Sequence, residues 1–239
     1  MAYDPIRDEI VVPQFYAQAI MTYRGEANGN EAPIRIIRGP DTQIANPARL
    51  TLDPVHGEIF VPLDDRLLVF PRDGQGNVAP IRVIEGPETQ MDANAVVVDP
   101  TRNLILVSGN SPGRTRTPSG DRLGQVLIFN RTDNGNVKPR AIIRGPKSGI
   151  VNTGLMAVYP PRGLFLLGIR SDENSSPENF VGVWSVNDNG DVPPRWMIGG
   201  PNAILRQIRG ITLDPKHKEV IISDKYLNAV LTFSFPEIF

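Results

Sequence analysis

The sequence predicts an all-β protein, a β-propeller of about five four-stranded blades with incomplete terminal blades. Three observations predict this fold. A phrase of about 50 residues recurs along the chain, the apolar segments are short and rich in β-branched and aromatic residues, and no stretch keeps the 3.6-residue apolar period of a helix. All 239 residues then belong to one domain, 1–239.

The repeat is marked by a Gly-Pro pair that closes each unit and returns at intervals of 47 to 59 residues. These intervals lie at or somewhat above the roughly 40–50 residues of a propeller blade. Within a unit, short apolar segments alternate with turn residues, which is the pattern of a small antiparallel sheet. The units cover approximately 1–40, 48–87, 94–146, 154–201 and 208–239.

Two dipeptides recur inside the units, and both indicate tight turns between strands. Asp can cap its own backbone and Pro presets φ, so Asp-Pro initiates a turn. Gly and Asn tolerate the positive φ that the next connection needs. The Asp-Pro pairs are Asp53-Pro54, Asp99-Pro100 and Asp214-Pro215, and the Gly-Asn pairs are Gly29-Asn30, Gly76-Asn77 and Gly135-Asn136.

The phrase that begins with Gly-Asn resembles the repeats of bacterial NHL-type propellers. It reads GNEAPIRIIRG and GNVAPIRVIEG in the first two units, with looser copies GNVKPRAIIRG and GDVPPRWMIGG in the next two. The resemblance covers nearly the whole chain and implies a propeller fold. Propellers of this group include lyases, lactonases, ligand-binding modules and interaction platforms, so the resemblance implies no single activity.

The composition excludes several kinds of site. The absence of Cys rules out disulfides, thiolate metal ligands and cysteine nucleophiles. A net charge of -1 predicts no nucleic-acid partner, and no apolar run approaches the ~20 residues of a membrane span. The two histidines, His56 and His217, fall at matching turn positions, where turn structure explains them better than a role as general base.

One face of the predicted propeller carries loops of unequal length. Because strands alternate in direction, the loop between the second and third strands lies on the same face as the connection between blades. That loop covers only 62–65 in the second unit, but 108–122 in the third and 170–179 in the fourth. Function is usually placed on such loops, although tolerated surface insertion is an equally good explanation.

The candidate binding residues lie on this long-loop face. The two long loops differ in sign, with Arg114 and Arg116 in one and Asp172 and Glu173 in the other. Since neighbouring blades carry them, the loops are expected to pair across the rim, contributing only ~0–1 kcal/mol. The connections between blades add polar residues near the mouth of the central channel, for which turn hydrogen bonds are the alternative role: Asn46, Arg49, Asn94, Asn152 and Arg209.

These observations favour a non-catalytic module that binds a protein or a small polar ligand on the long-loop face. No catalytic residue, metal ligand or cofactor is assigned. Two alternatives are left open. One is a divalent-metal-dependent hydrolase or lyase of the lactonase type, in which oxygen ligands hold Ca²⁺ or a similar ion. The other is a structural subunit of an extracellular assembly.

The two ends of the chain lead to further expectations. Residues 1–12 lack the basic and apolar regions of a signal peptide and enter a repeat part-way through. We interpret Met1 as a boundary within a longer protein whose secretion signal is absent here, and we expect a secreted or periplasmic location. The first unit has little room for a strand before Asp4, and the last lacks a fourth strand. We expect a five-bladed propeller the size of one chain with imperfect closure, and self-association through the open sheet edges is the alternative.

Overall fold

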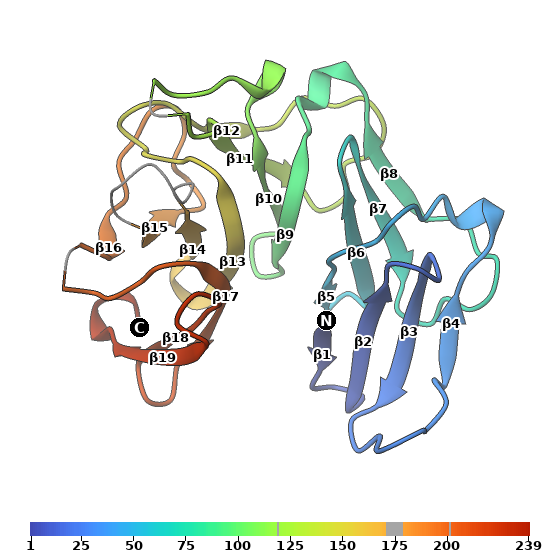
Figure 1. Ribbon diagram of the computed structural model, residues 1–239. Helices are drawn as coiled ribbons and strands as arrows, with labels where there is room; N and C mark the ends of the chain where they lie inside the picture. The colour runs from blue at the N-terminus through green and yellow to red at the C-terminus, as the bar shows by residue number, and fades with distance from the viewer. Residues whose placement is uncertain (119, 171–178, 201) are drawn as a thin grey trace.

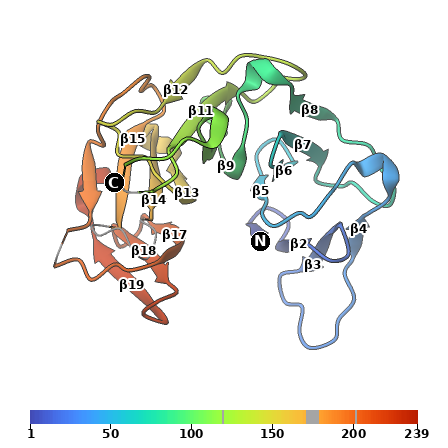
Figure 2. The same cartoon turned by 45° about the horizontal axis from the view of Figure 1, so that its top comes forward.

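The five blades follow one another along an arc in the order of the chain, with blade 1 and blade 5 at its two ends (Figures 1 and 2). This computed structural model describes residues 1–118, 120–170, 179–200 and 202–239. Each blade is one antiparallel sheet whose strands pair in sequence order. The predicted all-β, five-bladed propeller is therefore confirmed.

Four blades have four strands and blade 5 has three. Blade 1 comprises β1 (Ala2–Asp4), β2 (Glu9–Gln14), β3 (Ala19–Arg24) and β4 (Arg35–Ile37). Blade 2 comprises β5 (Thr51–Asp53), β6 (Glu58–Leu63), β7 (Arg66–Pro71) and β8 (Arg82–Glu85). Blade 3 comprises β9 (Ala93–Asp99), β10 (Leu104–Asn110), β11 (Gly124–Asn130) and β12 (Ala141–Ile143). Blade 4 comprises β13 (Thr153–Tyr159), β14 (Leu164–Ile169), β15 (Phe180–Ser185) and β16 (Trp196–Ile198), and blade 5 comprises β17 (Ile208–Asp214), β18 (Glu219–Asp224) and β19 (Ala229–Ser234).

The only helices among the described residues are short 3-10 turns that lie between strands or after the last one. None of them is long or apolar enough to cross a membrane. Each begins with a proline, whose fixed φ suits the first helical position. They are η1 (Pro40–Thr42), η2 (Pro87–Thr89), η3 (Pro112–Arg114), η4 (Pro160–Arg162) and η5 (Pro236–Ile238).

Blade 1 is complete, which corrects the expectation that both terminal blades lack a strand. Its innermost strand, β1, has only three residues, and all three pair with β2, from Ala2 opposite Val11 to Asp4 opposite Glu9. So short a strand shows no alternating pattern of its own, and the sequence alone therefore did not reveal it. Blade 5 lacks a fourth strand as expected, and β19 has no further strand beside it in the described part of the chain.

The aspartates of the Asp-Pro turns cap the backbone as predicted. Asp53 Oδ1 accepts hydrogen bonds from the backbone N–H of Val55 at 2.9 Å and of His56 at 3.2 Å. Asp4 and Asp99 accept the equivalent pair of bonds in blades 1 and 3. Because the carboxylate satisfies donors that the reversing backbone cannot pair, the innermost strands of blades 1, 2 and 3 turn sharply into the second strand.

Neighbouring blades are joined by a contact that we call the clasp, between the Gly-Pro of one blade and the Gly-Asn turn of the next. In the first clasp, Ile37 of blade 1 forms a parallel bridge to Gly76 of blade 2, and Asn77 Oδ1 accepts a hydrogen bond from the backbone N–H of Asp41 at 2.8 Å. The positive φ of Gly76, 71°, fits the turn prediction. The Asn next to it has a second role that the sequence did not show, because its partner lies in another repeat.

The clasp recurs between blades 2 and 3 and between blades 3 and 4. Asn136 Oδ1 accepts from the backbone N–H of Glu88 at 2.8 Å. In the last clasp an aspartate replaces the asparagine as hydrogen-bond acceptor. Asp191 Oδ1 accepts from the backbone N–H of Lys147 at 2.8 Å and of Ser148 at 3.0 Å. The repeat phrase therefore encodes contacts between blades as well as turns within them.

The core consists of layers of apolar side chains between successive blades. In the middle blades both faces of a strand are covered, so that the interior residues of β6, β10 and β14 are all buried. In the terminal blades only one face is covered, and burial alternates along β2 and β19. Four separate clusters of buried apolar side chains fill the four junctions between blades along the arc.

Candidate functional site

An irregularity recurs near the start of the innermost strand in blades 3, 4 and 5. The β9–β10 register shifts so that Ala93 and Ala95 are paired and Asn94 between them is not. The β13–β14 register shifts after Thr153, and the β17–β18 register shifts at Arg209, which lies between the paired Ile208 and Gly210. A β-bulge turns a side chain out of the regular alternation. The bulges therefore give Asn94 and Arg209 directions that the strand pattern does not supply.

Asn94 lines a cavity of 580 Å³ beside the start of β9, which we call the mouth cavity. The cavity lies where the connection from blade 1 to blade 2 meets the loop between β6 and β7 and the beginning of blade 3. Its polar lining combines amides, carboxylates and guanidinium groups: Gln43, Asn46, Arg49, Asp64, Asp65, Arg66 and Asn94.

Arg49 is the cationic centre of this lining. Its Nη1 donates to the backbone carbonyl of Asn94 at 2.8 Å and to Asn94 Oδ1, and Asn94 Nδ2 donates to the backbone carbonyl of Thr153 at 2.5 Å. Burial lowers the pKa of Arg49, and the positive charges of Arg170 and Arg209 lower it further. Arg170 follows β14 and Arg209 lies in β17, so positive charges from blades 4 and 5 act on Arg49 although neither residue lines the mouth cavity. A half-buried guanidinium group in such a positive field favours an anion.

Two other predicted site residues have backbone roles. Asn46 and Asn152 both adopt positive φ, 51° and 40°. Asn152 Oδ1 accepts from the backbone N–H of Arg122 at 3.0 Å, and its Nδ2 donates to Asp121 Oδ1 at 2.8 Å. Asn152 therefore ties the loop 108–122 to the start of β13, and the two segments share a face as expected. Asn46 also lines the mouth cavity.

The pairing of the two long loops stays a prediction. Asp172 and Glu173 lie outside the described residues. Arg116 Nη1 donates to the backbone carbonyl of Gly120 within its own loop, and Arg114 is the last residue of η3 in that loop.

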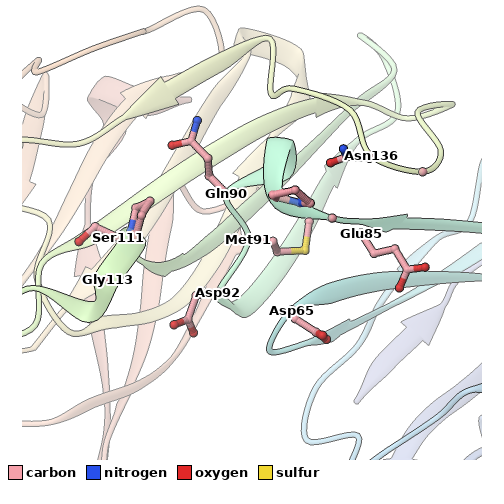
Figure 3. A pocket seen from close by; sticks show the side chains of 12 residues that line it. Asp65, Glu85, Gln90, Met91, Asp92, Ser111, Gly113 and Asn136 are labelled. Carbon is pink, nitrogen blue, oxygen red and sulfur yellow. The ribbon is translucent and has the colours of Figure 1, made fainter.

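A second, wider groove of 1070 Å³ lies beside the mouth cavity and shares Asp65 with it (Figure 3). Arg66 forms ion pairs with Asp65 at 3.0 Å and with Glu85 at 3.1 Å, and it lowers the pKa of Asp65. Asp92 Oδ1 accepts from Asn110 Nδ2 at 3.0 Å. The acidic groups of the groove already have partners within the chain. The sequence alone did not reveal the groove, because Asp65, Glu85 and Asp92 come from separate segments.

The histidines occupy the turns that follow the innermost strands, as predicted. His56 Nδ1 lies 2.6 Å from Asp53 Oδ2, and His217 Nδ1 lies 2.7 Å from Asp214 Oδ2. The same Asp–His pair therefore recurs in blades 2 and 5. In each pair the Asp also accepts a hydrogen bond from the backbone N–H of its His. The repeated pair therefore stabilises the conformation of the turn.

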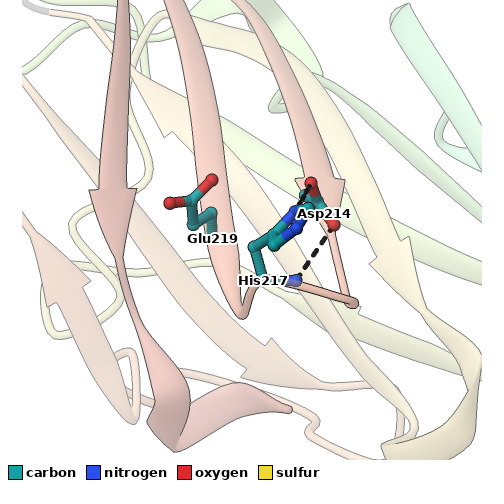
Figure 4. A group of neighbouring side chains, drawn as sticks. All are labelled: Asp214, His217 and Glu219. Atoms are coloured by element: carbon teal, nitrogen blue, oxygen red, sulfur yellow. Dashed lines mark hydrogen bonds and ion pairs between the residues drawn. The ribbon is translucent and has the colours of Figure 1, made fainter.

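In blade 5 the carboxylate of Glu219 joins this pair, and the three potential metal-ligand atoms lie within 4.8 Å of one another (Figure 4). In blade 2 the equivalent Glu58 instead forms ion pairs with Arg82 and Arg131, each at 2.8 Å. The Asp–His pair is thus formed whether or not a third ligand stands beside it. The group in blade 5 therefore gives no independent sign of an ion.

The Asp214–His217 contact is expected to be visible in the titration of the imidazole. The hydrogen bond to Asp214 raises the pKa of His217, and the same bond lowers the pKa of Asp214. The raised pKa of His217 stabilises the folded state fully at pH values below the pKa of an unfolded histidine. This contribution is lost as the pH rises through the pKa that His217 has in the folded protein. The lowered pKa of Asp214 stabilises the folded state at pH values above the pKa of an unfolded aspartate. This contribution is lost as the pH falls through the pKa that Asp214 has in the folded protein.

The measurement is an NMR titration of the imidazole C–H signals, assigned with His56→Gln. Asp214→Asn is expected to move the His217 midpoint to lower pH. An unchanged midpoint in Asp214→Asn would contradict the contact.

Comparisons with known proteins establish the fold alone. No family model matches the chain, and no curated protein matches it. A chain of the mitotic checkpoint complex superposes with a TM-score of 0.65 at 10% identity, covering 98% of this chain and 60% of that one. A chain of hydrazine synthase from Kuenenia stuttgartiensis superposes with a TM-score of 0.67 at 13% identity, covering 99% of this chain and 64% of that one. The protein thus spans less than two thirds of either chain, and its resemblance to NHL-type repeats stays a prediction.

Proposed function

We propose that the protein is a binding module that holds a small anionic ligand in the mouth cavity. The observation that carries the proposal is the position of Arg49, which is half-buried, fixed by Asn94 and close to the charges of two further arginines. A planar guanidinium can bind a carboxylate or phosphate through two parallel hydrogen bonds. An anion would also offset the positive charges of Arg170 and Arg209 that act on Arg49.

The lining supports recognition better than catalysis. The described lining of the mouth cavity contains no histidine, and Asp65 is paired with Arg66. Nucleophilic catalysis needs a nucleophile within hydrogen-bond reach of a base. Among the described residues, this lining offers amides, guanidinium groups and the carboxylates of Asp64 and Asp65, and no hydroxyl or imidazole group. A propeller is a scaffold that commonly mediates binding, and the proposal places the ligand where three blades meet.

The proposal is tested by thermal unfolding in citrate and in inorganic phosphate, against chloride at equal ionic strength. A ligand present at 100 times its Kd stabilises the folded state by about 2.7 kcal/mol, which is a large shift in Tm. Arg209→Gln is expected to weaken the binding constant about tenfold, because a charge-assisted contact contributes about 1.5 kcal/mol. Arg209 is exposed and donates no hydrogen bond to another described residue, so its replacement leaves the fold intact.

Arg140→Gln is the matched control, since it removes the same charge from an exposed position just before β12, the outermost strand of blade 3. The control is expected to bind as the unchanged protein does. Equal weakening in both variants would show a non-specific charge effect and contradict the proposed site. A rise in Tm with Ca²⁺ and none with either anion would favour the metal-dependent hydrolase instead.

A further inference from the structure

Blade 1 carries an uncovered apolar face on the side away from blade 2. We call it the outer face of blade 1. None of its six side chains is buried, and Tyr3 is 56% and Ile36 37% exposed. The opposite face packs against blade 2 through Val11, Ile20 and Ile37. The outer face consists of Tyr3, Ile10, Val12, Met21, Tyr23 and Ile36.

The strand registers show what covers this face in the other blades. In blade 2 the equivalent positions are all apolar, and they pack against blade 1: Leu52, Ile59, Val61, Leu68, Phe70 and Val83. In blade 3 they pack against blade 2: Val98, Ile105, Val107, Leu127, Phe129 and Ile142. The residues at these positions therefore form the surface with which a blade contacts the blade before it.

The clasp independently indicates that blade 1 can contact a further blade through its outer face. In blades 2, 3 and 4 the Gly-Asn or Gly-Asp turn contacts the Gly-Pro of the preceding blade. Blade 1 has the same turn, Gly29-Asn30, with Gly29 at a φ of 60°. Both residues are exposed, and Asn30 has no hydrogen-bond partner among the described residues. Blade 1 thus has the apolar surface and the clasp residue for a neighbour on this side.

We propose that the outer face of blade 1 and Asn30 dock a complete four-stranded blade of the same repeat kind, whose fourth strand ends in Gly-Pro. The apolar face covers the neighbouring sheet, and Asn30 Oδ1 accepts from the backbone N–H that follows the neighbour's proline. This junction lacks the ion pair that Arg72 makes to Asp4 in the next one, because Gly25 stands at the position of Arg72.

A second copy of the chain is a poorer occupant. Its free end is blade 5, which lacks the fourth strand and therefore the Gly-Pro that Asn30 would clasp. The free face of blade 5 is also more polar, with Thr212, Ser223 and Thr232 beside Ile221 and Val230. Self-association through blade 5 is therefore an outcome for the test to detect.

The test places a copy of residues 49–95 directly before Met1. Since Asp99 and Asp4 are equivalent, this join keeps the natural length of the connection between blades. Oxidation of each methionine by hydrogen peroxide is followed by peptide mass spectrometry. The added blade is expected to slow the oxidation of Met21 about tenfold, because exposure governs methionine oxidation. Met197, which is 58% exposed in blade 4, is the internal control and is expected to react as before.

Two variants of this fusion separate specific docking from simple crowding. Asn30→Asp is expected to keep the protection of Met21, because Asp191 makes the same clasp in blade 4. Asn30→Ala is expected to lose part of it. Unchanged oxidation of Met21 in a folded fusion, or equal protection in both variants, overturns the proposal. Protection of Met21 in the unfused chain that grows with protein concentration also overturns it, since a second copy would then be the occupant.

A measurement on the unfused chain keeps the proposal testable if the fusion does not fold. Met21→Gln combined with Ile36→Thr is expected to leave Tm nearly unchanged, because Met21 is only half-buried and Ile36 is exposed, and substitutions outside the core have small effects on stability. The same variant is expected to lower the fluorescence of a bound apolar dye such as anilinonaphthalene sulfonate. A large fall in Tm would show that the isolated chain already covers this face, and no docking surface would remain.

Discussion

Gly86→Ala is expected to lower the free energy of unfolding by about 3 kcal/mol, from backbone strain of about 1–3 kcal/mol and the loss of one hydrogen bond worth about 1 kcal/mol. Gly86 has φ 113° and ψ 167°, a region that only glycine adopts readily. A Cβ at this position would lie 2.6 Å from Asn136 Oδ1, which accepts from the backbone N–H of Glu88. The methyl group would therefore strain the backbone and open the clasp between blades 2 and 3.

Gly29→Ala is the matched control for this prediction. Gly29 also has positive φ, 60°, but a Cβ there would meet nothing within 4 Å. Its cost is expected to be only about 1 kcal/mol, that of the left-handed conformation. Urea unfolding followed by circular dichroism measures both variants. If both lost the same free energy, the contact with Asn136 would contribute nothing, and the Gly-Pro would serve only the turn.

The number of blades could be predicted from the sequence because the turn residues that mark each blade act locally. Asp53 closes its turn within three residues, and Gly76 takes its positive φ from the turn alone. The clasp could not be predicted in this way. Asn77 and Asp41 lie 36 residues apart, and their contact depends on how two blades pack. A strand of three residues such as β1 also escapes a period-2 pattern, since its pairing with β2 defines it.

For the candidate site, the sequence predicted which segments converge but not what each side chain does. Arg49 lies in the connection before β5, whereas Asn94 and Arg209 lie at the start of the innermost strands β9 and β17. In the structure Arg49 donates to Asn94, and the charge of Arg209 lowers the pKa of Arg49. The bulge at Asn94 is a property of the pairing between β9 and β10 and has no local sequence signal. Asn152 lies on the same face, but its amide is used to hold a loop.

Gly182→Leu combined with Trp184→Phe is expected to restore the stability that each change alone removes. In blades 2 and 3 the two equivalent positions hold Leu68 with Phe70 and Leu127 with Phe129. In blade 4 the same space is filled by the larger ring of Trp184, which is fully buried and stacks on Phe165 with ring centroids 5.8 Å apart. Glycine at 182 leaves room for this ring, because even a Cβ there would overlap it.

The two single changes fail for opposite reasons. Gly182→Leu alone forces a large side chain into occupied space, and such overpacking typically costs about 1–3 kcal/mol or more. Trp184→Phe alone leaves a cavity and removes the bond from Trp184 Nε1 to the backbone carbonyl of Val192, with an expected cost of about 2 kcal/mol. In the double variant the leucine fills the cavity, so the two costs should not add.

A double-mutant cycle from urea unfolding measures this coupling, which is expected to reach about 3 kcal/mol, the upper end for residues in contact. Trp196→Ala is a control, because Trp196 is only half-buried on the outermost strand β16 and should add independently to either single change. Strict additivity of Gly182→Leu and Trp184→Phe would mean that the sheets of blade 4 and blade 3 adjust separately. Strong coupling would mean that the two positions fill one shared space between neighbouring blades. A glycine with a tryptophan then fills it in blade 4, as a leucine with a phenylalanine does in blades 2 and 3.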